Sequence, residues 1–208
     1  MGDGARSWAR GLSAAALVGI AGGFATLPVW GLALVSLFAF SDLARREHRE
    51  GSPSGPDWVG WLMQLSFLAV LCAAAWDNRD ATSLIPLPGL LEALGLAAVA
   101  AGLELRRRTE RAMGRFFTVQ LRVDTDHRLV DEGPFRTIRH PSYASLGAIA
   151  LGTALAVRSP LAVLATLAIW LPVIVLRIRQ EEAELGRRLG GAYRDYARRT
   201  WRLVPGVY

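Results

Sequence analysis

The densest run of polar residues in the chain occupies positions 127–143, directly before an apolar stretch. Three of its side chains carry planar donor groups suited to a carboxylate or a phosphate, and two carry rings that could lie flat against a ligand. These five residues are Phe135, Arg136, Arg139, His140 and Tyr143. The run therefore favours an anionic ligand that contains a ring, although a cluster that only binds lipid headgroups is the plainer alternative.

Local sequence fixes where this run meets the apolar stretch. Gly133-Pro134 is a turn signal, and Pro141 restricts His140 to an extended conformation. We expect the next helix to begin just after His140, which places Arg139 and His140 at a membrane boundary.

A second polar feature, Arg177 to Glu184, follows another apolar run without a break. Arg177 and Glu181 are four residues apart and so share one face of a helix, whereas Glu182 points about 100° away. An arginine with a glutamate one turn later could hold a zwitterionic or cationic ligand. The alternative is an ordinary surface ion pair, which contributes only a few tenths of a kcal/mol.

Long apolar runs must position these residues, because 52% of the 208 residues are hydrophobic and only 20% are charged. Several runs are close to the roughly 20 residues that a membrane-spanning helix needs. The predicted spans are 11–40, 58–76, 84–105, 143–157 and 161–176. The chain is thus expected to be an all-α integral membrane protein with about five transmembrane helices, although 11–40 could instead form a hairpin.

The last two runs are short and are separated by Ser159 and Pro160, which predicts a helical hairpin that turns there. We expect one membrane domain in two parts. Residues 1–105 supply three spans, and residues 106–208 supply a connector, the hairpin 143–176 and a C-terminal helical segment.

Two glutamates lie in the third apolar run. Glu92 is either a functional group at membrane depth or a residue near the interface, after a helix start around Pro88. Glu104 is expected to pair with Arg107 or Arg108 at helical spacing.

Charge placement predicts the orientation in the membrane. The net charge is +6, all 24 basic residues are arginine, and 17 of them lie in residues 106–139 and 177–202. Short arginine-rich segments remain in the cytoplasm, so both polar segments are expected on the cytoplasmic face. The basic charge therefore indicates a membrane surface and not nucleic acid as its partner.

Several kinds of metal and cofactor site are excluded because the sequence lacks the motifs that would build them. Cys72 is the single cysteine, so neither a disulfide framework nor a cysteine metal cluster is expected, and no metal site is predicted. The chain lacks GxGxxG, Walker, HExxH, paired CxxC and GxSxG motifs, which excludes a soluble Rossmann-type cofactor domain.

Taken together, the two polar segments resemble the isoprenylcysteine carboxyl methyltransferase family and, more distantly, membrane phospholipid N-methyltransferases. The resemblance covers about the last 100 residues, in order and at matching spacing. Its first half is Gln120, His127-x-Leu129-Val130, Gly133-Pro134-Phe135 and Arg139-His140-Pro141-Ser142-Tyr143. Its second half is Arg177-x-x-x-Glu181-Glu182, Gly191-x-Tyr193-x-x-Tyr196 and Arg202-x-x-Pro205.

This resemblance implies a membrane methyltransferase that uses S-adenosylmethionine, with site residues carried over position by position. It implies catalytic roles for His140, Arg177 and Glu181, with Arg177 on the substrate side. The implied cofactor-binding residues are Gln120, His127, Arg128, Leu129, Val130, Phe135, Arg139, His140, Pro141, Ser142, Tyr143, Glu181 and Glu182.

The chain departs from the family pattern at two positions. Phe135 replaces a commoner tyrosine and keeps the ring without the hydroxyl. Ser145 stands where a glycine is frequent, which puts close backbone packing there in doubt.

The expected function is methyl transfer to a lipophilic or amphiphilic acceptor at the cytoplasmic membrane face. The arginine-only composition, rich in alanine and glycine, suggests a bacterial source, where a lipid or small amphiphile suits better than a prenylated protein. Two alternatives stay open: an NADPH-dependent membrane reductase of the steroid or sterol reductase type, and a protein that only binds lipid headgroups. The reductases typically have asparagine at the position of Ser142.

Overall fold

The computed structural model describes residues 58–77, 89–113 and 131–208. Within these residues the chain is helical, apart from turns and one isolated β-bridge between Ile138 and Trp201. The elements are α3 (Trp58–Asp77), α4 (Leu90–Met113), the 3₁₀ turn η2 (Gly133–Arg136), α5 (Pro141–Ala156), α6 (Pro160–Ala165), the π-helical turn η3 (Thr166–Trp170), α7 (Leu171–Leu189) and α8 (Gly191–Arg199).

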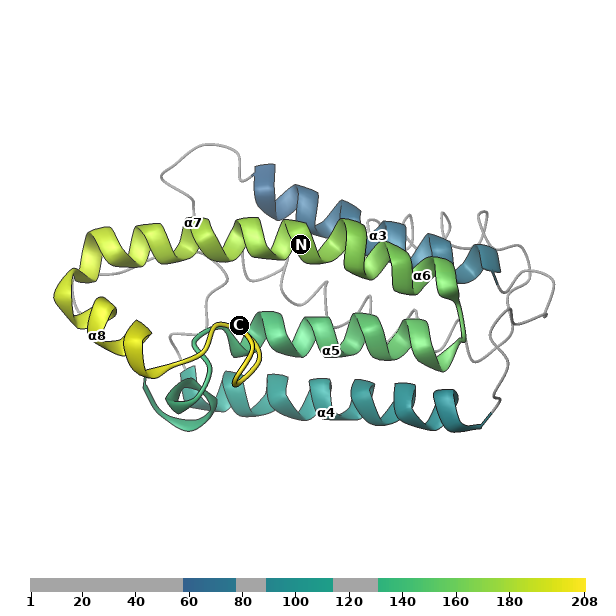
Figure 1. Ribbon diagram of the computed structural model, residues 1–208, viewed down its shortest axis with the longest axis horizontal. Helices are drawn as coiled ribbons and strands as arrows, with labels where there is room; N and C mark the ends of the chain where they lie inside the picture. The colour runs from purple at the N-terminus through teal and green to yellow at the C-terminus, as the bar shows by residue number, and fades with distance from the viewer. Residues whose placement is uncertain (1–57, 78–88, 114–130) are drawn as a thin grey trace, which may run out of the picture.

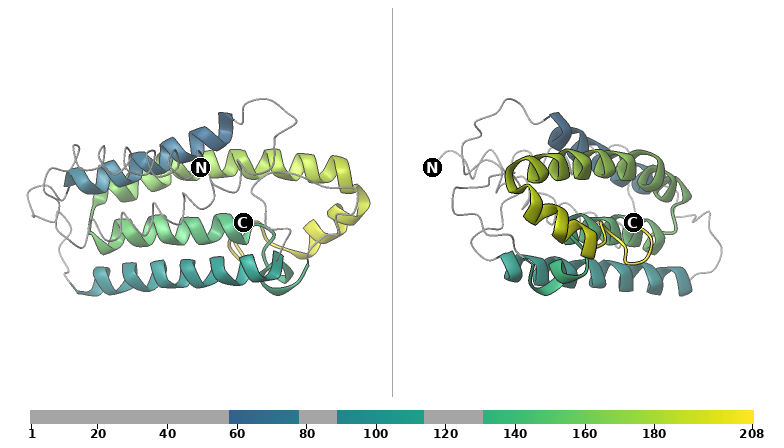
Figure 2. Two further views of the ribbon diagram at one scale, coloured as in Figure 1. Left: turned by 180° about the vertical axis from the view of Figure 1, so that it is seen from behind. Right: turned by 60° about the vertical axis from the view of Figure 1, so that its left-hand side comes forward.

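These helices form two layers (Figure 1). Helices α4 and α5 lie side by side in one layer, while α3 lies along α6, η3 and α7 in the other. Figure 2 shows that α8 folds back from the end of α7 toward the α4–α5 layer, so it joins the two layers at one end of the bundle. The last residues of the chain also lie at this end.

The predicted hairpin is confirmed. α5 ends at Ala156, and Pro160 begins the next helix after a turn in which Ser159 caps the backbone N–H of Ala162 at 3.0 Å. Asp77, the last residue of α3, accepts hydrogen bonds from the Ser159 hydroxyl at 2.6 Å and the Leu161 backbone N–H at 2.9 Å. The hairpin turn is therefore held against the end of α3.

Among the residues that the structure describes, two helices are long and apolar enough to cross a membrane: Trp58–Asp77, and the continuous helix Pro160–Leu189 of 30 residues. Leucines on α3, α4 and α6 are more than half exposed, among them Leu65, Leu94 and Leu164. Such side chains suit a hydrocarbon environment. The count of five spans and the two-part division stay predictions, since residues 11–40 and 84–88 lie outside the described residues.

Helix α4 differs from its predicted span. It continues past residue 105 to Met113, because its charged residues pair one turn apart. Glu104 accepts from Arg108 at 2.9 Å, as predicted, and Arg106 pairs with Glu110 at 3.1 Å. Glu92 lies in the first turn of α4 and pairs with Arg158 at 3.2 Å, which agrees with a place near the helix start.

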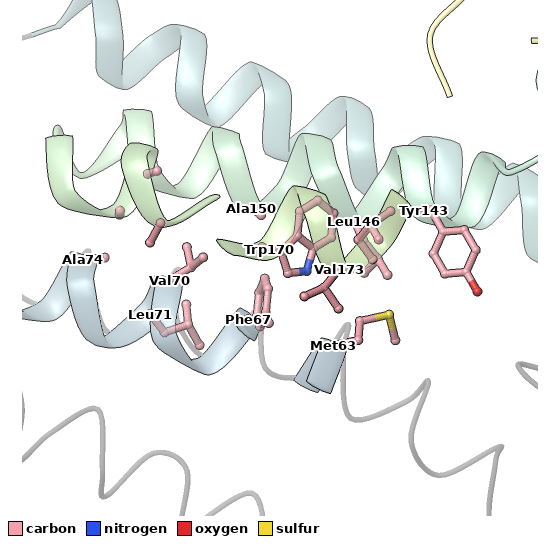
Figure 3. Close-up of a cluster of buried hydrophobic side chains, with 14 of the residues drawn as sticks. Met63, Phe67, Val70, Leu71, Ala74, Tyr143, Leu146, Ala150, Trp170 and Val173 are labelled. Carbon is pink, nitrogen blue, oxygen red and sulfur yellow. The ribbon is translucent and has the colours of Figure 1, made fainter. Parts of the chain in front are cut away.

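A buried hydrophobic cluster joins the two layers (Figure 3). Met63, Phe67 and Val70 of α3 face Leu146 and Ala150 of α5 across Trp170. Trp170 is only 2% exposed and ends the π-helical turn, which widens the helix by one residue. The cluster extends to Tyr143, so the apolar core reaches directly to the polar end of the bundle.

Helices α4 and α5 approach closely at glycines. A Cβ atom on Gly95 would lie 2.3 Å from the backbone nitrogen of Ala156, and one on Gly102 would lie 2.8 Å from the carbonyl oxygen of Ser145. The backbone around Ser145 is therefore tightly packed in spite of its hydroxyl, which turns back to the Ser142 carbonyl at 2.6 Å.

This close approach predicts a strong effect of a single methyl group. Gly95→Ala should push α4 and α5 apart and cost about 1–3 kcal/mol, the usual range for overpacking. Gly186→Ala is the matched control in a helix interior, because a Cβ atom there meets open space. It should stabilise by about 0.5–1 kcal/mol, since glycine is unfavourable within a helix. Thermal unfolding in detergent measures both, and equal effects would contradict this packing.

Candidate active site

Two polar segments far apart in the sequence meet at the end of the bundle where α8 lies. Residues 137–140 pair with residues 201–202 through main-chain hydrogen bonds. The N–H of Arg139 donates to Trp201 O at 2.8 Å, the N–H of Trp201 donates to Thr137 O at 2.9 Å, and the N–H of His140 donates to Arg202 O at 3.1 Å. The C-terminal segment is thereby fixed beside the start of α5.

His140 is the residue just before α5 and is 4% exposed. Its backbone has φ −122° and ψ 58°, so it avoids the helical region as expected before proline. The ψ angle is smaller than the extended conformation that the sequence predicts. The reason is that the His140 N–H bonds to Arg202 O while its carbonyl already accepts the first helical bond, from the Ala144 N–H.

Three basic side chains of the site meet at the Glu182 carboxylate. It accepts from Arg139 Nε at 2.7 Å, from Arg202 Nη2 at 2.9 Å, and lies 3.3 Å from His140 Nε2. The Glu182 side chain is 14% exposed and that of Arg139 is 10% exposed. The hydrogen bond from Arg202 to Glu182 raises the pKa of the guanidinium above its ordinary value, so this pair stays charged.

Glu181 is differently placed from its neighbour. Its side chain is 27% exposed, and its carboxylate lies 3.8 Å from His140 Nδ1. The Tyr143 hydroxyl interacts with both Glu181 and the buried Arg177. The structure therefore brings Arg177 and Glu181 to one face of α7, as predicted, and turns that face toward α5.

Two rings complete this face. The His140 and Tyr143 ring centroids are 5.8 Å apart, with a tilt of 34° between the planes. Tyr143 is 7% exposed and belongs to the hydrophobic cluster, so its ring is apolar on one side while its hydroxyl reaches charged groups.

Helix α8 closes the site from the other side. The Tyr196 hydroxyl donates to Phe135 O at 2.9 Å, and Arg139 Nη1 donates to Ala197 O at 3.3 Å and also to Thr200 O. The Tyr193 hydroxyl, one turn earlier on α8, is buried and has no hydrogen-bond partner among the described residues.

The predicted site residues divide into three groups. His140, Tyr143, Arg177, Glu181 and Glu182 come together, with Pro141 and Ser142 forming the first turn of α5 beside them. Phe135 is buried, and its carbonyl accepts the hydrogen bond from the Tyr196 hydroxyl. The residues Gln120, His127, Arg128, Leu129 and Val130 lie outside the described residues.

The expectation for the arginines needs correction. Arg136 is exposed on η2 and does not join Arg139 and His140 at Glu182. Because its side chain is exposed, the three planar donors that the sequence groups together do not all meet at Glu182. A contact between Arg139 and the cofactor stays a prediction. The Arg139 guanidinium is bonded to Glu182 and to two carbonyls, which gives it a structural part in the site.

Two residues with a part in the site were not assigned one from the sequence. Arg202 and Tyr193 stand within the motif spacing, but nothing in their local pattern indicates which segment they contact. Arg202 pairs with Glu182, and the charged groups that act on Tyr193 include Glu182 and Arg139. These groups lie outside α8 in the sequence, so the arrangement depends on how α8 folds back.

Residues 94–187 match the model of the isoprenylcysteine carboxyl methyltransferase family. Over this segment the chain is similar to that family. The match contains α5, the hairpin, and Arg177 to Glu182, which supply part of the site, whereas α8 and Arg202 lie beyond the matched residues.

Curated relatives carry the same family name. The chain is 32% identical over 115 residues to protein-S-isoprenylcysteine O-methyltransferase B of Arabidopsis thaliana, covering 54% of this chain and 58% of that protein. It is 33% identical over 128 residues to protein-S-isoprenylcysteine O-methyltransferase of Tribolium castaneum, covering 58% and 45%. The matches to the most similar of these isoprenylcysteine carboxyl methyltransferases span about three fifths of the relatives' length.

A solved structure shares the fold. The eukaryotic intramembrane Ras methyltransferase, an isoprenylcysteine carboxyl methyltransferase, aligns with a TM-score of 0.59 at 22% identity and covers 93% of this chain and 73% of that chain. The all-helical architecture is therefore similar to the fold of that intramembrane protein.

The contacts of Glu182 lead to a prediction about the free energy of unfolding. Glu182→Gln would leave the Arg139 and Arg202 charges without a carboxylate in a mostly buried setting, at a cost of about 3 kcal/mol or more. Glu184→Gln, two residues along the same helix, is the matched control. Its partners Arg187 and Arg188 are 71% and 41% exposed, so its loss should cost a few tenths of a kcal/mol.

Chemical or thermal unfolding in detergent distinguishes the two variants. If Glu182→Gln unfolds at the same denaturant concentration as Glu184→Gln, the Glu182 contacts contribute no more than a surface pair.

Proposed function

We propose that this protein transfers the methyl group of S-adenosylmethionine to a lipophilic or amphiphilic carboxylate at the cytoplasmic face of a membrane. The observation that carries the proposal is the meeting of His140 and Tyr143 with Arg177 and Glu181, within the segment that matches the methyltransferase family. The names of its relatives, protein-S-isoprenylcysteine O-methyltransferases, support O-methylation of an isoprenylcysteine-type carboxylate.

The residues at this site fit the cofactor. Glu181 keeps its carboxylate partly accessible, so it can bind the ammonium group of a zwitterionic ligand, while the His140 and Tyr143 rings offer flat surfaces. Pro141, Ser142 and Phe135 would border the same ligand, and Gln120 and residues 127–130 are proposed to contribute as the family resemblance implies. When bound, S-adenosylmethionine supplies a methyl group already activated by its sulfonium.

The protein then has to orient two reactants and keep water out, and no nucleophilic side chain is required. Arg177 is 6% exposed and lies beside the Tyr143 hydroxyl, so its guanidinium is held in place at the edge of the apolar core. A fixed guanidinium in that position suits the carboxylate of an amphiphile whose tail stays in the hydrocarbon.

A carboxylate acceptor also fits the contacts that His140 and Glu182 already make among the described residues. Glu182 already accepts from two arginines, and His140 lies between the carboxylates of Glu181 and Glu182. An amine or thiol acceptor would have to lose a proton to one of these engaged groups. A carboxylate is already ionised at neutral pH and needs no such step.

The position of the site supports a membrane-surface reaction. A helix of 30 residues is about 45 Å long, whereas the hydrocarbon core of a bilayer is about 30 Å thick. The C-terminal part of Pro160–Leu189, which carries Glu181 and Glu182, therefore projects beyond the hydrocarbon. The arginines of this polar end support the cytoplasmic side as its location, because short arginine-rich segments favour that side.

Ligand binding separates this proposal from its alternatives. Isothermal titration of the detergent-solubilised protein should give binding of S-adenosylmethionine and none of NADPH. Binding of NADPH alone would favour a membrane reductase, and binding of neither would overturn both enzymatic functions and leave a lipid-binding protein.

Three substitutions test the assignment within the site. Glu181→Ala and His140→Ala should lose cofactor binding, because they remove the accessible carboxylate and the residue that positions it. Arg177→Ala should keep binding but lower turnover by at least about a hundredfold, since an arginine that orients a reacting carboxylate contributes on the order of 3 kcal/mol.

Turnover is followed as transfer of tritiated methyl to an S-farnesylated cysteine analogue and, in parallel, to lipid extracts. Glu184→Gln serves as the control that should retain both binding and turnover. Undiminished turnover in all three site variants would contradict the assignment.

A further inference from the structure

One buried polar atom at this end of the bundle is left unused by every contact described so far. The Tyr193 side chain is 5% exposed, and its hydroxyl has no hydrogen-bond partner among the described residues. A buried hydroxyl without a partner costs free energy in the folded protein, and such groups are uncommon unless a ligand or water satisfies them.

The surroundings of this hydroxyl are those of the site. The charged groups that act on it are the carboxylates of Glu182 and Glu181 and the guanidinium groups of Arg139 and Arg202. Burial, and after it the charge of Glu182, raise the pKa of Tyr193 well above its ordinary value. The phenol therefore keeps its proton at neutral pH and is available as a hydrogen-bond donor.

The matched residue one turn later behaves differently. Tyr196 is equally buried, at 3% exposed, but its hydroxyl donates to the Phe135 carbonyl at 2.9 Å. The two rings are neighbours, with centroids 6.3 Å apart. On helix α8, Tyr196 therefore holds the 3₁₀ turn by a hydrogen bond, whereas the Tyr193 hydroxyl has no acceptor among the described residues.

The geometry points to Tyr193 as a ligand-binding residue, whose hydroxyl donates to the carboxylate of the amino-acid end of bound S-adenosylmethionine. This inference rests on the proposed function. Glu181 is the accessible carboxylate suited to the ammonium group of that end, and it is among the charges that act on Tyr193. An amino-acid end carries both charges close together, so a donor within the electrostatic reach of Glu181 suits its carboxylate better than it suits the adenine ring.

Paired substitutions on α8 test this role. Tyr193→Phe removes no intramolecular hydrogen bond, so its unfolding temperature should not fall, yet its affinity for S-adenosylhomocysteine should drop about tenfold. Its affinity for 5′-methylthioadenosine, which lacks the amino-acid end, should not change. Tyr196→Phe should unfold at a lower temperature and keep its affinity for S-adenosylhomocysteine within about twofold.

The outcomes are distinguishable by titration calorimetry and thermal unfolding of the full chain. If the wild-type protein binds no S-adenosylhomocysteine, the proposed function fails and this inference fails with it. If the wild type binds but Tyr193→Phe binds equally well, the inference alone is overturned. An equal loss for both ligands, or an equal loss in Tyr196→Phe, would also overturn a specific contact with the amino-acid end.

Discussion

The Glu182 carboxylate contacts side chains from two segments that also pair with each other through main-chain hydrogen bonds. Arg139 and His140 come from the residues just before α5, and Arg202 comes from the segment after α8. Taking these charges out of water is costly, and the cost is offset only because the carboxylate oxygens have close partners. Glu181 is the next residue in the same helix, so whatever fixes Glu182 also fixes the direction of Glu181.

The rest of the bundle provides a rigid base for this arrangement. Glycines let α4 and α5 pack backbone to backbone, and Asp77 holds the hairpin turn at the opposite end from the site. Between these ends, Trp170 and its neighbours fill the space from α3 to α5. Helix α7 continues without a break from the apolar core to Arg177 and Glu181. The packing of the apolar core therefore determines where these two polar side chains lie. The site is thus built where a long helix leaves the hydrocarbon.

Much of this could be predicted from local sequence. The hairpin at Ser159 and Pro160 follows from a proline between two apolar runs, and the shared face of Arg177 and Glu181 follows from helical spacing. The Glu104–Arg108 pair has the same origin. Such features depend on residues a few positions apart, and sequence spacing describes them well. The family resemblance added what spacing could not, namely that the two polar segments belong to one site.

The remaining features depend on contacts between distant residues. Arg139 and Glu182 are 43 residues apart, and Arg202 reaches Glu182 only because α8 folds back. For this reason local sequence groups Arg136 with Arg139 as planar donors, whereas in the structure Arg139 is bonded to Glu182 and Arg136 is exposed. The return of the C-terminal segment to residues 137–140 likewise uses main-chain hydrogen bonds, which side-chain patterns do not report.

The central claim is that the two polar segments form one cofactor site around Glu181 and His140. An experimental structure with S-adenosylhomocysteine bound tests it most directly. The predicted result is a ligand that contacts residues 140–143 and Glu181 at the same time, with the Glu182 contacts to Arg139 and Arg202 retained. A ligand bound away from α7, or one that contacts only one of the two segments, would contradict the claim.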